Sequence, residues 1–261
     1  MLPSLGSTRL PDLRRSQIAF MLDGIAQRAG PVMADRTLAY LRAALNWYAA
    51  RADDWQSPLV RGMMRLATDQ RTRVLDDVEL RRLWAGTADG APFSRFVRVL
   101  LLTGQRRCEV AGMQWSELST AWTIPGERSK SGQAHLVPLV PLMMVQLPPR
   151  GVGPYVFSTT CGRRPLGGFG KPTERLRKTT GTRGWRLHDL RRTMRTRLAS
   201  LRVPEQVAEL VIGHGKRGLA RVYDQHRYVS EMREALELWA LEVGRITGDR
   251  SEARDLSDAA T

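Results

Sequence analysis

The side chains best suited to chemistry gather in residues 187–228, LHDLRRTMRTRLASLRVPEQVAELVIGHGKRGLARVYDQHRY. His188 and Arg191 are three residues apart, so on a helix they project from one face. His214 lies between two glycines, and Tyr223 follows nine residues later. A guanidinium binds phosphate oxygens with paired donors, imidazole exchanges protons near neutral pH, and a tyrosine can serve as a nucleophile. These residue types are suited to chemistry on a phosphate group, although each alone is more often a surface or packing residue.

Two predicted helices position these groups. The first carries an apolar stripe at steps of three and four residues: Leu187, Leu190, Met194, Leu198 and Leu201. The second starts near Pro204 and stops at Gly213. His214 is therefore expected just past a helix end, and Tyr223 on a short helix that follows.

The charge of the chain points to its partners. Its 261 residues contain 41 Lys and Arg against 26 Asp and Glu, a net charge of +15. Phosphate backbones bind such surfaces by releasing condensed counterions, which favours nucleic acid. A solubilising surface and an anionic membrane are the alternatives on charge alone.

Other sequence features narrow the class of protein. The two cysteines, Cys108 and Cys161, have no CxxC spacing, so we expect neither a disulfide framework nor a metal site. No apolar run approaches the ~20 residues that span a bilayer. The amino terminus lacks the apolar core of a signal peptide, which predicts a reducing, cytoplasmic setting.

The periodicity predicts two domains and a tail. Residues 1–72 should form a small helical domain, with helices over 16–30 and 34–51 and a third over 59–67. A polar basic linker covers 67–74, and a larger domain follows over 73–248. The polar tail 249–261 is expected to be disordered.

The larger domain should be mainly helical with a small antiparallel sheet, an α+β fold. Helices are predicted from Asp76 or Asp77 to Gly86, and over 93–104, 172–180 and 229–246. Strands are predicted over 121–125 and 134–140, joined by a turn that holds Lys130, and a further strand over 155–158. Four tryptophans next to apolar positions are expected in the core: Trp47, Trp115, Trp185 and Trp239.

Five motifs, in order, resemble the tyrosine recombinase (phage integrase) family. They are TGQRRCEV, a lysine on a hairpin turn before HLVPL, then HDLR, GH and VYDQHRY. The resemblance covers about residues 8–247 and is closest to integrases of prophages and integrative elements. It implies a helical core-binding domain that clamps DNA, cut short at its amino terminus and without the arm-binding domain, followed by a catalytic domain.

The resemblance also implies a set of site residues. By motif position, the catalytic set is Arg106, Lys130, His188, Arg191, His214 and Tyr223, and Glu109 supports it. Phosphate contacts are expected from a second set of arginines: Arg36, Arg42, Arg128, Arg163, Arg164, Arg192 and Arg195. Tyr228 is the rival nucleophile, but the interval from His214 favours Tyr223.

These residue types suit the breaking and rejoining of a phosphodiester. Two arginines stabilise charge on the phosphate oxygens, at ~3–4 kcal/mol for each well-aimed donor. The tyrosine, with a pKa of about 10, needs a base or a positive pocket, and His188 is placed to assist. Lys130 would protonate the leaving 5′-oxygen, and His214 would hydrogen-bond the phosphate. A 3′-phosphotyrosyl intermediate conserves the bond energy, so no metal, ATP or other cofactor is expected.

Partners and alternatives follow. The resemblance implies attachment sites on double-stranded DNA, a homotetramer on two duplexes, possible accessory DNA-bending proteins and a place near the nucleoid. Taken singly, each site residue is more often a surface or packing residue, and only the ordered set favours catalysis. The alternatives are a type IB topoisomerase that relaxes supercoils and a catalytically idle, truncated DNA-binding remnant.

Overall fold

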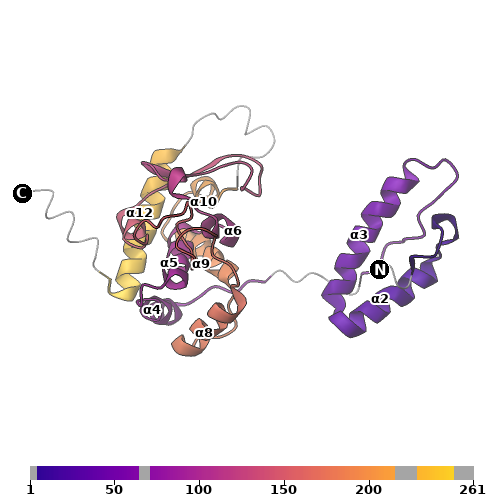
Figure 1. The fold of residues 1–261 in the computed structure, drawn as a ribbon, viewed down its shortest axis with the longest axis horizontal. Helices are drawn as coiled ribbons and strands as arrows, with labels where there is room; N and C mark the ends of the chain where they lie inside the picture. The colour runs from indigo at the N-terminus through magenta and orange to yellow at the C-terminus, as the bar shows by residue number, and fades with distance from the viewer. Residues whose placement is uncertain (1–4, 65–70, 215–227, 250–261) are drawn as a thin grey trace, which may run out of the picture. The chain divides into compact units, whose positions relative to one another are not determined.

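The computed structural model describes residues 5–64, 71–214 and 228–249 and divides the chain into two compact units, unit 1 (residues 1–71) and unit 2 (residues 72–261). Figure 1 shows the helices of each unit. The expected fold, mainly helical with a small antiparallel sheet, is confirmed.

Over its described residues, unit 1 contains two α-helices that pack against each other. A 3₁₀ turn, η1 (Leu10–Asp12), precedes α2 (Arg15–Ala29) and α3 (Pro31–Ala49). Gly30, with φ of +85°, makes the turn between them, and Pro31 starts the second helix. Apolar residues at helical spacing form its small core: Ile18, Met21, Leu22, Leu38, Leu41 and Leu45.

Two expectations for unit 1 are wrong. The described part of the third predicted helix, residues 59–64, is not helical. Gly62 has φ of +84°, which breaks a right-handed helix, and Leu59 and Met63 pack on the core from an irregular segment instead. Trp47 is 60% exposed on the outer face of α3, where the guanidinium of Arg51 lies 4.3 Å from its ring centre.

Unit 2 is a helical domain with a two-stranded sheet. Its elements within residues 72–214 and 228–249 are α4 (Asp77–Ala85), α5 (Pro92–Thr103), α6 (Arg107–Ala111), η2 (Trp115–Glu117), β1 (Ala121–Ile124), β2 (His135–Pro138), α7 (Pro141–Met144), α8 (Gly170–Thr180), α9 (Leu187–Ser200), α10 (Glu205–Val211) and α12 (Val229–Thr247). β1 and β2 pair antiparallel, with Trp122 opposite Val137. The hairpin and the helices predicted for this region are therefore confirmed over the described residues.

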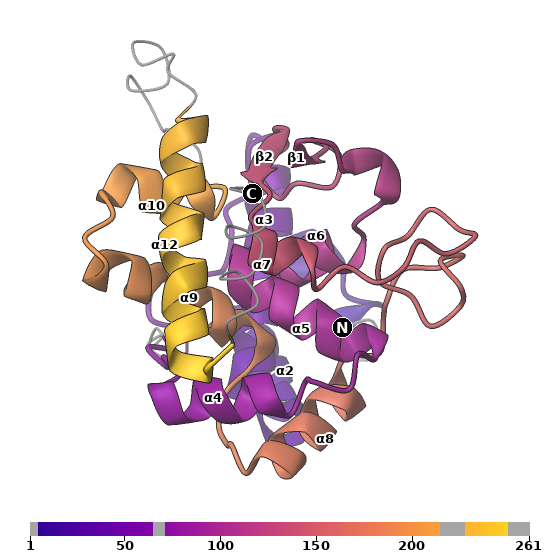
Figure 2. The same cartoon turned by 90° about the vertical axis from the view of Figure 1, so that its left-hand side faces the viewer.

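The apolar helix α5 lies at the centre of unit 2. It contacts α6, α7, α9 and α12, and Figure 2 shows α12 crossing in front of α9 and α10, both of which it contacts. Trp185 and Trp239 are fully buried in this core, as predicted, and Trp115 packs partly buried against it. The core thus fixes α9 and α10, the helices that carry the predicted chemistry.

The strand predicted over 155–158 is not formed. Tyr155 makes a single bridge to Gln114. Its backbone N–H instead donates to the carbonyl of Gly162, 3.1 Å away, so the segment pairs with a neighbouring loop rather than with the sheet. The predicted tail lies outside the described residues, apart from Asp249.

Candidate active site

Arg106 lies at the corner between α5 and α6. α5 ends at Thr103 and is followed by Gly104, whose φ of +61° turns the chain, and Arg106 is the residue that precedes α6. One oxygen of Glu109 accepts a hydrogen bond from the Arg106 guanidinium and the other from its backbone N–H, each at 2.9 Å. Glu109 thus holds both the backbone and the side chain of Arg106. Since Glu109 is only 3% exposed, water competes little for these hydrogen bonds.

Arg191 projects from α9 into the protein, although it carries a charge. It is 5% exposed, and its guanidinium donates to the carbonyl of Gly104 at 2.8 Å, which ties α9 to the Arg106 corner. Burial, and secondarily repulsion from Arg106, lowers its pKa to about 10, so Arg191 stays charged at neutral pH. Two guanidiniums are thus held close enough to interact.

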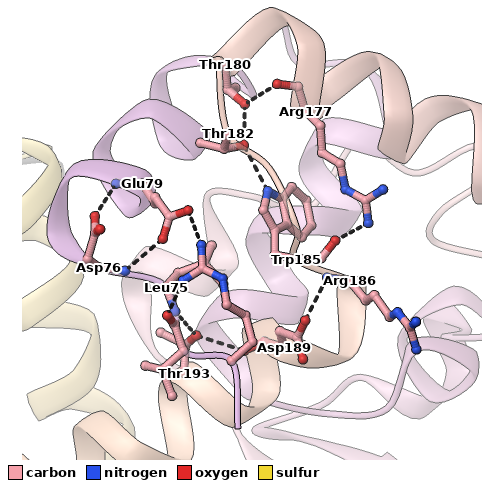
Figure 3. Close-up of polar contacts among 12 residues, drawn as sticks. Leu75, Asp76, Glu79, Arg177, Thr180, Thr182, Trp185, Arg186, Asp189 and Thr193 are labelled. Carbon is pink, nitrogen blue, oxygen red and sulfur yellow. Dashed lines mark hydrogen bonds and ion pairs between the residues drawn. The ribbon is translucent and has the colours of Figure 1, made fainter. Parts of the chain in front are cut away.

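A polar network fixes the start of α9 (Figure 3). Asp189 accepts from the backbone N–H of Arg186 at 2.8 Å and so caps the helix. The hydroxyl of Thr193 donates to the carbonyl of Asp189 and accepts from the N–H of Leu75, which joins α9 to the segment before α4. The positions of His188 and Arg191 follow from this anchoring.

His214 follows α10 directly, as predicted from the glycines beside it. Gly213 has φ of +71° and turns the chain out of the helix. The Nδ1 atom of His214 lies 2.5 Å from a carboxylate oxygen of Glu209, and its Nε2 atom lies 3.1 Å from the Arg191 guanidinium. The structure therefore brings two predicted site residues from different helices into contact.

A cleft of about 690 Å³ is lined by three residues of the predicted catalytic set, by the supporting Glu109 and by Arg128 of the predicted phosphate-contact set. Arg106, Lys130 and His188 line it, and Lys130 is exposed on the hairpin turn, as expected. Burial lowers the pKa of His188, and repulsion from Arg191, Arg192 and Arg106 adds to this against the opposing effect of Asp189. The imidazole of His188 is therefore neutral at pH 7 and able to accept a proton.

Sequence reasoning missed several residues of this cleft. Arg107, Arg177 and Arg186 also line it, together with Phe169, whose ring centre lies 4.9 Å from the guanidinium of Arg107. Two signals are present in the sequence: Arg107 directly follows Arg106 in TGQRRCEV, and Arg186 lies two residues before His188 of the HDLR motif. The arrangement can bind an oxyanion and exchange protons with it.

The predicted phosphate-contact residues lie in different surroundings. Arg163 and Arg164 are exposed in a loop of unit 2, whereas Arg36 (exposed) and Arg42 (half-buried) lie on α3 of unit 1. Three others are held in ion pairs: Arg128 with Glu117, Arg192 with Asp189, and Arg195 with Glu209. A phosphate contact by one of these three would have to share or replace a carboxylate.

The predicted nucleophile, Tyr223, lies outside the described residues, as does the short helix expected around it. Tyr228, the rival, immediately precedes α12 and packs partly buried against the core of unit 2. The described residues contain no group of three His, Cys, Asp or Glu side chains arranged to hold a metal ion. Of the helices in the described ranges, none is both long and apolar enough to cross a membrane.

Comparison with known proteins places this geometry in context. The model of the phage integrase family matches residues 73–229. Prophage integrase IntF of Escherichia coli (strain K12) is 25% identical over 267 aligned residues, which cover 94% of this chain and 57% of the relative. This chain thus spans little more than half the length of that curated relative.

Solved structures share the fold. A lambda integrase tetramer bound to a Holliday junction matches 79% of this chain and 66% of its own, with a TM-score of 0.63 and 20% identity. A dimer of lambda integrase (75-356) bound to a COC′ core site matches 82% of this chain and 83% of its own, with a TM-score of 0.62 and 21% identity. The Tn1549 transposon integrase in complex with circular intermediate DNA matches 88% of this chain and 87% of its own, with a TM-score of 0.62 and 17% identity.

Proposed function

This chain belongs to the phage integrase family, and on that premise we propose that it is a site-specific DNA recombinase that cuts and rejoins strands through Tyr223. The observation that carries the proposal is the grouping of Arg106, Lys130 and His188 on one cleft, next to the Arg191–His214 contact. Similar folds whose structures contain DNA support the choice of substrate.

In the proposed reaction, the phenol oxygen of Tyr223 attacks the scissile phosphorus and the bond to the 5′-oxygen breaks. The neutral imidazole of His188 accepts the phenol proton, and Lys130 gives a proton to the leaving 5′-oxygen. Arg106 and Arg191 bind the nonbridging oxygens, where negative charge develops. A 5′-hydroxyl of a second strand then reverses the step and releases the tyrosine.

The remaining parts of the proposal follow from this reaction. Each transesterification replaces one phosphoester by another, so the chemistry requires no metal, ATP or other cofactor. We assign residues 1–72 to a DNA-clamping role and 73–248 to catalysis. Strand exchange between two duplexes calls for four protomers, with accessory DNA-bending proteins where the attachment sites require them, and for a cytoplasmic location at the nucleoid.

The test is covalent capture on a nicked suicide substrate. The nick lets the short 5′-hydroxyl strand diffuse away, so a 3′-phosphotyrosyl adduct accumulates and migrates slowly on a denaturing gel. Because the target sequence is not known, a pool of duplexes with randomised half-sites serves as substrate. We expect an adduct with the native chain and with Tyr228→Phe, and none with Tyr223→Phe.

Other outcomes would assign a different function. An adduct that persists in Tyr223→Phe and disappears in Tyr228→Phe would move the nucleophile. Relaxation of supercoiled plasmid without strand exchange would favour a type IB topoisomerase. DNA binding without any adduct across the pool would favour an idle DNA-binding remnant.

A further inference from the structure

We propose that Glu209 is a positioning residue for the imidazole of His214, and that Arg195 holds Glu209 in place. The effect of Glu209 on catalysis rests on the proposed recombinase function. Its effect on the tautomer of His214 depends only on contacts within the free protein. No motif of the chain includes Glu209, which lies five residues before His214 on α10.

The donors and acceptors around His214 specify which of its nitrogens carries the proton. A guanidinium can only donate, so the Nε2 atom that faces Arg191 at 3.1 Å must be the acceptor. The proton then lies on Nδ1, which donates to Glu209 at 2.5 Å. Glu209 thus selects the tautomer and turns Nε2 toward Arg191.

Glu209 is itself held on three sides. Its second oxygen accepts from Nε of Arg195 at 2.6 Å, and its backbone carbonyl accepts the N–H of His214 at 2.9 Å. Partial burial acts to raise the pKa of Glu209, but the hydrogen bonds from Arg195 and His214 outweigh it and keep the pKa below its ordinary value. The carboxylate is therefore ionised at neutral pH.

The consequence for the reaction concerns the moment at which a phosphate binds. Arg191 remains tied to Gly104 through one guanidinium nitrogen, which leaves the nitrogen that faces His214 to turn to the phosphate. Nε2 of His214 then lies next to the same oxygen, and the hydrogen bond from Nδ1 to Glu209 behind the ring holds the imidazole in this position. In metal sites, removing such a partner behind a ligating histidine typically costs ~10–100-fold in affinity or activity, and we expect the lower end of that range for His214.

Glu205 provides a matched comparison within the same helix. It also approaches Arg195, at 3.7 Å, but its side chain is 88% exposed, against 36% for Glu209. Among the contacts of the described residues, Glu205 has none with His214. Glu205→Gln therefore removes the same charge from α10 without touching the imidazole.

The first experiment uses the full chain without DNA. Two-bond ¹H–¹⁵N correlation spectra report which nitrogen of a histidine is protonated, and His214→Gln identifies the signal of His214. We expect the Nδ1-protonated form in the native chain and in Glu205→Gln, and a mixture with the Nε2-protonated form in Glu209→Ala. Arg195→Ala, which frees Glu209, should give an intermediate spectrum.

The second experiment measures single-turnover adduct formation on the suicide substrate. Glu209→Ala should slow the step at saturating DNA about 10-fold, with unchanged DNA affinity, and Glu205→Gln should leave it unchanged. The inference is overturned if Glu209→Ala keeps the native tautomer pattern, or if Glu205→Gln reproduces its effects. If the native chain forms no adduct at all, the proposed function fails, while the spectra still decide whether Glu209 controls His214.

Discussion

At two helix ends in unit 2, a glutamate carboxylate holds a predicted site residue, but the two carboxylates differ in burial and in partners. At the start of α6, Glu109 holds Arg106, and at the end of α10, Glu209 holds His214. Glu109 is 3% exposed and gives both oxygens to one residue, whereas the side chain of Glu209 is 36% exposed and divides its oxygens between His214 and Arg195.

The difference separates two kinds of support. The buried carboxylate of Glu109 belongs to the fold, because it also compensates the buried charge of Arg191 against the repulsion from Arg106. A half-exposed carboxylate shared between partners costs the fold little when lost, because water replaces it. Mutations at the Arg106 corner should therefore affect stability and activity together, and mutations at the His214 end should affect mainly activity.

The largest effect is expected at Glu109. Glu109→Ala removes the partner of both the guanidinium and the backbone N–H of Arg106, so we expect a loss of about 3 kcal/mol in the free energy of unfolding. Adduct formation should fall at least 100-fold, because a displaced guanidinium no longer meets the phosphate. Urea denaturation and the suicide-substrate assay measure the two losses.

Glu237→Gln, on an exposed face of α12, is the control for charge and should change neither quantity. A Glu109→Ala chain as stable as the control would contradict the assignment of this carboxylate to the fold. A chain that loses stability but keeps the native adduct rate would show that Arg106 finds its position without Glu109.

The sequence predicts those parts of the site that depend on local spacing. The apolar stripe of α9 and the glycines beside His214 place three site residues correctly on their elements. The family resemblance also implies Glu109, and the structure adds how it acts: it accepts the backbone N–H of Arg106, the residue before α6.

Contacts between distant segments are not accessible in the same way. Arg195 meets Glu209 only because α9 packs against α10, and Arg128 meets Glu117 only because the hairpin folds back on η2. The helix predicted over 59–64 is absent for a local reason. The apolar spacing fits a helix, but Gly62 has a left-handed backbone conformation that a right-handed helix excludes.

Gln105 connects the two helix ends, and its removal should have the next largest effect. Its side-chain amide donates to the carbonyls of Thr103 and Val211, at 2.9 and 2.7 Å, and so joins the end of α5 to the end of α10. Gln105→Leu keeps the volume but leaves buried carbonyl groups with fewer donors. We expect a loss of about 1–3 kcal/mol in the free energy of unfolding, measured by urea denaturation.

The spectra of the free protein extend this test to the site. If Gln105 couples the two ends, Gln105→Leu should also shift the signals of His214, whereas Gln133→Leu on the exposed hairpin turn should not. Native stability in Gln105→Leu would show that the two corners are held independently.

The smallest effect is expected at His135, whose Nε2–H donates to the carbonyl of Val211 at 3.3 Å. Burial lowers the pKa of His135 below its ordinary value of 6.5, and repulsion from Arg191 and Arg106 adds to this against the bond to Val211 and the charge of Glu109. Between the two pKa values the unfolded chain binds a proton that the folded chain does not. The stability tied to His135 is therefore complete above pH 6.5 and declines as the pH falls toward the lowered value.

His135→Gln retains a donor for Val211 but cannot titrate. At about pH 8 we expect its free energy of unfolding to lie within about 1 kcal/mol of the native value. Its decline toward about pH 5.5, followed by urea denaturation, should be shallower than that of the native chain. His188 has a lowered pKa of the same sign, but it is present in both chains and cancels in their difference. Parallel declines would show that folding does not change the proton affinity of His135.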